Sequence, residues 1–258
     1  MKQPTLHILC AIHKPSPIPP LDFIVPVHVG AVNATWQSPF LKDNEGDNIS
    51  GKNSYYNEIT ALYWAWKNKA FSGSDYIGLC HYRRFFMAHR PFLSKKGVYK
   101  FNLNSNDYLP KISGMPKAAA QLLAKHDLVI SKPSWARDRN DHKISIEEQF
   151  GVWHHGEDWQ LLRESIAVHQ PAYKASFEVY SKMQKFNQLN MYIGKRNFLD
   201  QYLPWVMSIL EPLEIKVAQR TDPYQKRAIG FLGERLLGLY ILHQQLSTAW
   251  LPVAFLEE

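Results

Sequence analysis

Apolar runs near the amino terminus predict two extended segments. The first, Leu6–Ile12, is almost continuously hydrophobic and stops at a His-Lys-Pro sequence, which is typical of a buried strand followed by a loop. The second spans Phe23–Ala31 and contains Pro26, which favours an edge position or an irregular stretch over a central strand. The polar segment Lys42–Asn53, rich in Asn, Asp and Gly, is predicted to be a loop.

A helical periodicity replaces this pattern after residue 53. Apolar side chains recur at i, i+3, i+4 and i+7 from Ile59 to Trp66, which predicts one face of a helix, with Asn53 as its N-cap and Gly73 as its stop. The apolar run Asp75–Cys80 then predicts a buried strand. A strand, a helix and a second strand in succession indicate an α/β fold.

The rest of the chain repeats this alternation and then becomes mostly helical. The predicted helices are Pro116–His126, Glu157–His169, Ala172–Met183, Phe198 to about Val217, and Tyr224–Leu246. The predicted strands are Asp127–Ser131, Asn190–Gly194 and Ala249–Phe255. No linker separates two independent units, so we expect one domain over 1–258, with an α/β half at 1–135 and a mainly helical half at 136–258.

Composition narrows the class of partner. The 258 residues are 45% hydrophobic and carry a net charge of +7, which excludes a disordered chain and favours an anionic partner such as a nucleotide, a nucleic acid or an acidic membrane surface. The basic residues are dispersed, and no Lys/Arg stripe or base-reading module is present. The sequence therefore argues against a dedicated nucleic-acid binder.

The cysteines and the apolar runs indicate the cellular compartment in which we expect the protein. Cys10 and Cys80 both lie inside apolar runs, where a thiol behaves as a small hydrophobe, so neither a disulfide framework nor a zinc site is predicted. The start of the chain is too polar for a signal peptide, and no run of 18 apolar residues occurs. We expect a cytoplasmic protein with at most peripheral contact with the inner face of the membrane.

The most informative polar cluster follows the strand that ends at Cys80. His81, Tyr82, Arg83 and Arg84 stand where ligands bind in open α/β sheets, outside the carboxyl end of a strand. Two guanidinium groups can bind a diphosphate and stabilise the charge of a departing nucleoside diphosphate. The alternative is a solvated basic turn.

A second candidate anion site lies in the loop before the first helix. Asp47, Asn48 and Asn53, followed by Glu58, supply amides and carboxylates next to a helix N-terminus, which is suited to anion binding. The same residue types are ordinary turn and cap formers. Both interpretations stay open.

A third cluster contains His154, His155 and Asp158. On a helix, the first and last would lie at i and i+4, where they could hold a metal or pair a base with a carboxylate. The alternative is a surface or capping interaction. No Asp-x-Asp sequence follows a strand, which weakens any scheme in which Mn²⁺ or Mg²⁺ bridges carboxylates and diphosphate.

The last predicted helix carries charges within an apolar sequence. Glu234 is flanked by Arg235 and lies two turns from Arg227, so it is a candidate general base with basic neighbours. His155 and Asp158 are its rivals, and a structural Glu–Arg pair on a solvated face is the alternative. Among the aromatic residues, Trp135 and Trp153 stand in polar surroundings and are candidate sugar platforms.

Together these segments resemble a bacterial capsular and exopolysaccharide glycosyltransferase family that was first catalogued as a domain of unknown function. The pieces that carry the resemblance are Asp47-Asn48, Asn53, Glu58–Asn68, the Y-I-G-L-C-H-Y-R-R-F-F sequence Tyr76–Phe86, Asn190–Ile193 and the G-F-L-G-E-R-L-L sequence Gly230–Leu237. They span nearly the whole chain. At Tyr192 this sequence departs mildly from the more usual N-M-F-I.

The resemblance implies a GT-A-like, Rossmann-type nucleotide-sugar-binding sheet. In such a fold the first strand would bring Ile12, His13 and Lys14 to the nucleotide, and Asn190, Arg227 and Arg235 would join the donor site. The HYRR sequence takes the place of the metal-binding Asp-x-Asp of other GT-A enzymes. Arg83 and Arg84 are therefore expected to replace a metal ion, and no firm cofactor is predicted.

The function that the resemblance implies is hexosyl transfer, with inversion, from a nucleotide-diphospho-sugar, UDP-linked and carrying galactofuranose or another hexose. The acceptor would be an oligosaccharide or lipid-linked glycan of a capsule, exopolysaccharide or lipopolysaccharide O-antigen, made together with other polysaccharide-assembly enzymes. The alternative is a non-enzymatic carbohydrate- or nucleic-acid-binding protein that uses the same basic patch.

Overall fold

The structure is a computed structural model that describes residues 4–89, 96–218 and 222–257. Its strands are β1 Leu6–Ile12, β2 Ile24–His28, β3 Leu41–Lys42, β4 Tyr76–His81, β5 Arg84–Phe86, β6 Val98–Asn102, β7 Leu128–Ser131, β8 Ser134–Trp135, β9 Lys185–Phe186, β10 Tyr192–Lys195, β11 Thr248–Leu251 and β12 Val253–Glu257. Its helices are α1 Asn53–Tyr56, α2 Ile59–Lys67, α3 Leu109–Ile112, α4 Met115–Leu123, α5 Ile146–Trp153, α6 Glu157–His169, α7 Lys174–Lys182, α8 Arg196–Leu210, α9 Glu214–Ala218 and α10 Ala228–His243.

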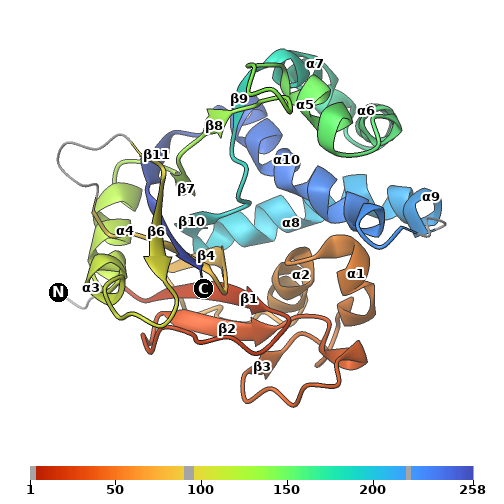
Figure 1. Ribbon diagram of the computed structural model, residues 1–258. Coiled ribbons are helices and arrows are strands. Elements are labelled where there is room, and N and C mark those ends of the chain that lie inside the picture. The colour runs from red at the N-terminus through yellow and green to blue at the C-terminus, as the bar shows by residue number, and fades with distance from the viewer. Residues whose placement is uncertain (1–3, 90–95, 219–221, 258) are drawn as a thin grey trace.

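A mixed sheet with helices on both faces forms the centre of the molecule (Figure 1). The strand order is β11-β7-β10-β4-β1-β2-β3, and β5, β12 and β6 extend the sheet from β4. Strands β1, β2 and β4 are parallel, while β10 runs antiparallel to both of its neighbours. The predicted α/β fold is confirmed, and the sheet takes strands from both halves of the sequence.

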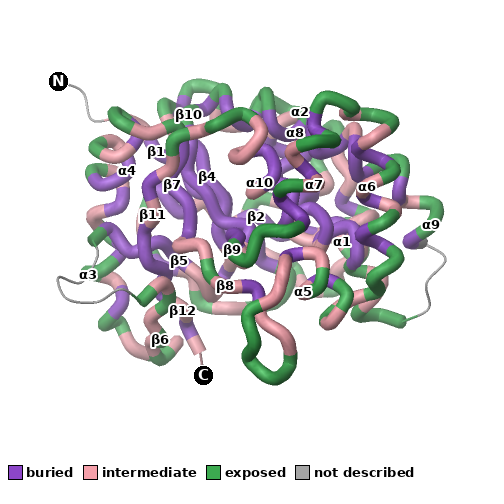
Figure 2. The backbone as a smooth tube through the Cα atoms, turned by 90° about the horizontal axis from the view of Figure 1, so that it is seen from above, coloured by how far each residue is buried: buried purple, intermediate pink, exposed green. Residues whose placement is uncertain are grey.

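The sheet is buried on both faces because its side chains alternate between two cores. Along β1, Leu9 and Ala11 join the core under α2, α8 and α10, whereas Ile8, Cys10 and Ile12 join the core under α3 and α4. The buried strands at the centre of Figure 2 show the result. Burial on both faces explains why β1 and β4 are continuous apolar runs.

The two cysteines confirm the packing prediction. Cys10 and Cys80 are paired neighbours on β1 and β4, and both are buried free thiols. Burial raises the pKa of the Cys80 thiol, which keeps it protonated. Pro26 also lies as expected, because β3 pairs only with Val27 and His28, so within the described residues the outer side of Pro26 has no strand partner.

The helix predicted after Asn53 is broken in the structure. Asn53 has helical dihedral angles and lies inside α1, so its assignment as the N-cap is wrong; its side chain instead donates to the Asn57 carbonyl at 2.7 Å. Asn57 adopts a φ of 52°, which ends α1 and lets α2 start at Ile59. The second helix ends at Lys67, well before the predicted stop at Gly73.

Boundaries elsewhere also differ from the prediction, most clearly in two segments. The segment predicted as one strand, Ala249–Phe255, forms β11 and β12, because Pro252 interrupts it and the two parts pair with different strands. The helix predicted to run to Val217 ends at Leu210, where Pro212 follows within a short turn. None of the described helices is long and apolar enough to cross a membrane.

Candidate active site

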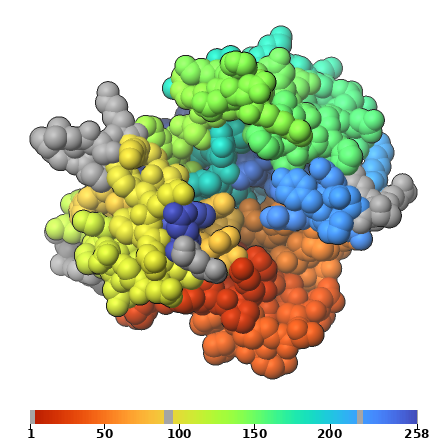
Figure 3. All heavy atoms as spheres, in the orientation of Figure 1, coloured from red at the N-terminus to blue at the C-terminus, as the bar shows by residue number. Residues whose placement is uncertain are grey.

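A cleft of about 690 Å³ opens at the carboxyl ends of the parallel strands β1, β2 and β4. Figure 3 shows a hollow at the centre of this face, between the amino-terminal segments below and the helical segments above. Its lining residues are Ala11, His13, Lys14, Val29, Asn53, Ser54, Asn57, Glu58, His81, Tyr82, Arg83, Arg84, Pro223 and Arg227. The topology places it at the position where α/β sheets bind ligands.

The HYRR sequence reaches the cleft through a tight turn. His81 ends β4 and pairs with Arg84 at the start of β5, so Tyr82 and Arg83 form the turn between two antiparallel strands. The Tyr82 amide donates to the Ala11 carbonyl at 3.2 Å, and the Arg83 carbonyl accepts from the amide of Leu256 at 2.8 Å. The backbone of the turn is thus fixed on both sides.

Both arginine side chains of this turn face aromatic rings. The Arg83 guanidinium carbon lies 5.3 Å from the Tyr82 ring centroid, and that of Arg84 lies 5.7 Å from the Phe255 centroid. Within the described parts of the chain, neither arginine has a carboxylate partner in an ion pair. Their positive charges are therefore open to an anion in the cleft.

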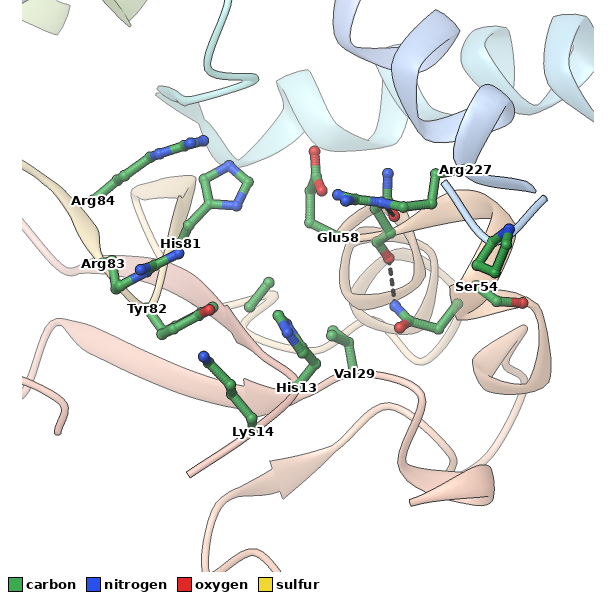
Figure 4. Close-up of a pocket in the computed structure, with 14 residues that line it drawn as sticks. His13, Lys14, Val29, Ser54, Glu58, His81, Tyr82, Arg83, Arg84 and Arg227 are labelled. Atoms are coloured by element: carbon green, nitrogen blue, oxygen red, sulfur yellow. Dashed lines mark hydrogen bonds between the residues drawn. The ribbon is translucent and has the colours of Figure 1, made fainter. Parts of the chain in front are cut away.

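His13 and Lys14 lie beside Tyr82 along the lower side of the cleft in Figure 4, across from Glu58 and Arg227. His13 contacts Tyr82 edge to face, with ring centroids 5.3 Å apart, and the Lys14 ammonium lies 5.9 Å from the same ring. Burial lowers the pKa of His13, and the positive charges of Lys14, Arg227 and Arg83 lower it further. His13 is therefore neutral at neutral pH and can donate one hydrogen bond and accept another.

His81 is held as a neutral imidazole of known tautomer. Its Nε2 donates to the Leu189 carbonyl at 2.9 Å, so Nδ1 carries no proton when the ring is neutral. Burial lowers the pKa of His81, although the nearby Glu58 carboxylate opposes this effect.

Glu58 is the carboxylate among the residues that line the cleft. One of its oxygens accepts from the Asn190 side-chain amide at 2.7 Å, and Asn190 is itself buried with a φ of 45°. In Figure 4 the Glu58 side chain stands between His81 and Arg227. Glu58, at the α1–α2 junction, and Asn190, just before β10, are far apart in sequence but therefore meet beside the cleft.

Glycines let α10 approach the α1–α2 junction. A Cβ atom at Gly230 would lie 1.9 Å from the Asn57 side-chain nitrogen, and one at Gly233 would lie 2.4 Å from the Ile59 side chain. This close approach brings Arg227, just before α10, within hydrogen-bond reach of Asn57, with Nε to Oδ1 at 3.0 Å. Arg227 therefore closes one side of the cleft.

Glu234 lies on α10 behind the residues that line the cleft. Its side chain is 22% exposed, is paired with Arg235 at 2.7 Å, and is not among the residues that line the cleft. The pKa of Glu234 is raised to about 7, chiefly by burial and also by the charge of Glu58, while the charges of Arg235, Arg84 and Arg227 oppose the rise. Glu234 thus interacts electrostatically with cleft residues without lining the cleft.

Several residues expected at the donor site lie elsewhere. The side chain of Ile12 is fully buried in the core under α4, and Arg235 is buried against Phe150 and Phe186, where it donates to the Phe231 carbonyl and to Gln149. Both side chains therefore lie in the protein interior and not in the cleft.

Asp47 and Asn48 also lie outside the cleft, contrary to the prediction. The Asp47 amide donates to Asn68 at 3.1 Å and its carboxylate lies 3.8 Å from Lys67, so this loop is fastened to the far end of α2. The Asn48 side chain bonds Gly46 and the Ser50 amide within its own turn. For these two residues the turn interpretation is the one that the structure supports.

The third predicted cluster does not form. His154 ends α5 in an extended conformation and Asp158 lies in α6, so the two do not share a helix. Asp158 is buried and His155 is exposed, while the His154 ring stacks on Phe231 at 4.1 Å and burial lowers its pKa to about 3. Among the described residues no group of three or more His, Cys, Asp or Glu side chains could hold a metal ion. Metal independence stays a prediction.

Five residues that line the cleft are not among the site residues predicted from the sequence: Ala11, Val29, Ser54, Asn57 and Pro223. For Asn57 a signal was present, because Asn is one of the few residues other than glycine that readily adopt a positive φ, and it directly precedes Glu58. Nothing in the local sequence marks the other four.

A mixed α/β sheet with a basic cleft at its strand ends places the protein among GT-A-like glycosyltransferase folds. The chain belongs to the family described as "Domain of unknown function (DUF4422)", whose model matches residues 7–245. The apo structure of WbbM, a bifunctional glycosyltransferase, is similar with a TM-score of 0.87 and 25% sequence identity. The match covers 98% of this chain and 46% of WbbM, so the chain spans about half the length of that protein. No curated protein matches the sequence.

Proposed function

We propose that the protein is a glycosyltransferase that uses a nucleotide-diphospho-sugar, UDP-linked, and transfers a hexose such as galactofuranose to a growing bacterial surface polysaccharide. The observation that carries the proposal is the concentration of Lys14, Arg83, Arg84 and Arg227 in one cleft at the strand ends. A concave site with several positive charges and one carboxylate fits a small anionic substrate. The fold shared with WbbM supports transfer to a glycan acceptor as the chemistry.

In the proposed reaction an acceptor hydroxyl attacks the anomeric carbon of the donor sugar. A bond forms between the acceptor oxygen and that carbon while the bond to the diphosphate oxygen breaks, and the diphosphate leaves with the electron pair. Arg83 and Arg84 stabilise the charge that develops on the diphosphate. Because Glu234 lies behind the residues that line the cleft, the hydroxyl proton passes to it through a bridging water molecule, and the single displacement inverts the anomeric configuration.

A nucleoside diphosphate is expected to stabilise the folded protein. Because a ligand that binds only the native state stabilises it by about 2.7 kcal/mol at a hundredfold excess over Kd, UDP should raise the melting temperature measurably. The measurement is a thermal shift with UDP, GDP, ADP and their sugar conjugates. Wild type should respond and Arg83→Ala should respond less, whereas an unchanged melting temperature with every nucleotide at millimolar concentration would refute the donor site.

Turnover is expected to survive chelation. Arg83 and Arg84 already supply two positive charges beside the proposed diphosphate position, and Lys14 supplies a third. Transfer or donor hydrolysis should therefore proceed at a similar rate with EDTA and with added Mn²⁺. Loss of activity in EDTA together with recovery in Mn²⁺ would show that a metal ion, rather than the arginines, carries this role.

A further inference from the structure

A second hollow, of about 500 Å³, lies beside the β8–β9 ribbon. We call it the Trp135 pocket, after the indole in its wall. Among the described residues, its charged lining residues are Lys132, Arg137 and Lys185, and none of its lining residues is a carboxylate. The pocket is therefore basic, like the cleft, but it is built from different strands.

Two further observations show how the lysine ammonium groups near Trp135 are positioned. The ammonium groups of Lys143 and Lys185 lie 4.0 and 4.1 Å from the centroid of the Trp135 ring. The backbone arranges this group, because Trp135 pairs with Lys185 across the ribbon and Arg137 forms a bridge with Lys143. A cation–π contact orders an ammonium group but leaves its charge to be neutralised.

The two lysines that contact Trp135 differ from Arg137 in their ion pairs. Arg137 pairs with the exposed Asp141 at 3.0 Å, whereas Lys143 and Lys185 have no acidic partner within the described residues. The Trp135 ring is occupied by ammonium groups, so it does not offer the open sugar platform that its polar surroundings suggested. The pocket is suited to an anion, with the indole edge as an apolar neighbour.

One short segment connects the Trp135 pocket to the cleft. Gln188 and Leu189 line the pocket, and the Gln188 side chain donates to the Trp135 carbonyl at 3.0 Å. The Leu189 carbonyl accepts from His81, and the next residue, Asn190, holds Glu58. This segment therefore runs from the lining of the Trp135 pocket to two residues, Leu189 and Asn190, that hold the cleft side chains His81 and Glu58.

We propose that the Trp135 pocket binds the anionic group of the acceptor, a saccharide that carries a carboxylate or a phosphate, while its reacting hydroxyl extends into the cleft. This inference rests on the proposed function. Charge-assisted hydrogen bonds from lysine and arginine provide the affinity. The pocket is separate from the cleft proposed for the donor diphosphate but is joined to it through Leu189 and Asn190, so we assign the anion to the acceptor rather than to the donor.

The test is direct binding of small probes, measured by calorimetry in the absence of donor. Cellobiouronic acid and glucose 1-phosphate are expected to bind at least about tenfold more tightly than neutral cellobiose, and the difference should shrink at high salt. Whichever charged sugar binds more tightly identifies the source of the anion, an acidic sugar or a phosphate. Inorganic phosphate binding as tightly as either charged sugar would overturn the proposal, because the saccharide would then contribute nothing.

Substitutions at the Trp135 pocket test whether the charged sugars bind there. Lys185→Glu and, independently, Lys143→Gln are expected to abolish the preference for charged sugars, whereas Lys174→Glu makes the same charge change as Lys185→Glu at an exposed position on α7 and should keep it. Equal losses in Lys185→Glu and Lys174→Glu would show only general charge attraction and would overturn the assignment.

UDP affinity separates this inference from the proposed function. UDP should bind wild type and Lys185→Glu equally, because Lys185 is not in the cleft. If UDP binds but charged sugars show no preference over cellobiose, the Trp135 pocket proposal alone fails. If charged sugars bind as expected and no nucleotide binds, the proposed function fails instead.

Discussion

Replacement of Arg83 or Arg84 by alanine is expected to lower kcat for sugar transfer by about 10²-fold or more. Removing one preorganised group that stabilises transition-state charge costs about this much in other enzymes. Both arginines line the cleft beside aromatic rings and have no competing carboxylate within the described chain. Each is therefore positioned before the substrate arrives, which is the condition for a large electrostatic effect.

Two comparisons isolate the role of these charges. Arg83→Lys keeps a charge but loses the planar, bidentate donor, so its kcat should fall between wild type and Arg83→Ala. Arg139→Ala removes an exposed arginine that packs over Trp153, away from the cleft, and should transfer sugar at the wild-type rate. An Arg83→Ala, Arg84→Ala double variant with near wild-type kcat would remove the basis for the proposed leaving-group role.

The strand ends could be predicted because their sequence pattern is local. The run Leu6–Ile12 corresponds to β1, and the run before His81 corresponds to β4. Once both are parallel strands of one sheet, their polar successors must share an edge. This is why His13, Lys14 and the HYRR residues meet in the cleft as the sequence indicates.

The remaining parts of the site depend on contacts that no local pattern encodes. Asp47 is close in sequence to Asn53, which lines the cleft. Its contacts with Lys67 and Asn68 at the end of α2 nevertheless keep it outside the cleft. The approach of α10 depends on Gly230 opposite Asn57, a pair separated by most of the chain. A hydrophobic periodicity identifies both helices but says nothing about which faces touch.

The interrupted helix is a similar case. The apolar spacing of α2 predicted its inner face, yet the break at Asn57 follows from one residue with a positive φ. That break turns Glu58 toward the cleft, where Asn190 from the second half of the chain binds it. The sequence therefore predicts both Glu58 and Asn190 as site residues, whereas the hydrogen bond between them is visible only in the folded structure.

Replacement of Glu234 by glutamine is expected to lower transfer by about 10²- to 10⁴-fold while UDP still binds, because the variant keeps the shape of the side chain and removes the proton acceptor. Donor affinity should persist because Glu234 does not line the cleft. The measurements are transfer rate, UDP affinity and the anomeric configuration of the product. Glu157→Gln, an exposed substitution at the start of α6, is the matched control.

The pH profile provides a second readout. A general base acts only when deprotonated, so with the pKa of Glu234 raised to about 7, kcat/KM should fall as the pH drops below about 7. His81 does not account for such a limb, because burial lowers its pKa below 6.5. In Glu234→Gln the residual activity should no longer show this dependence.

Glu58 supplies the decisive comparison, because it is the carboxylate that lines the cleft and its charge raises the pKa of Glu234. Glu58→Gln removes that charge, so the limb of the pH profile should move to lower pH while transfer continues. The opposite pattern, in which Glu58→Gln loses transfer and Glu234→Gln retains it, would assign the proton to Glu58. A product that keeps the donor's anomeric configuration would contradict the single displacement altogether, because one in-line attack at the anomeric carbon must invert it.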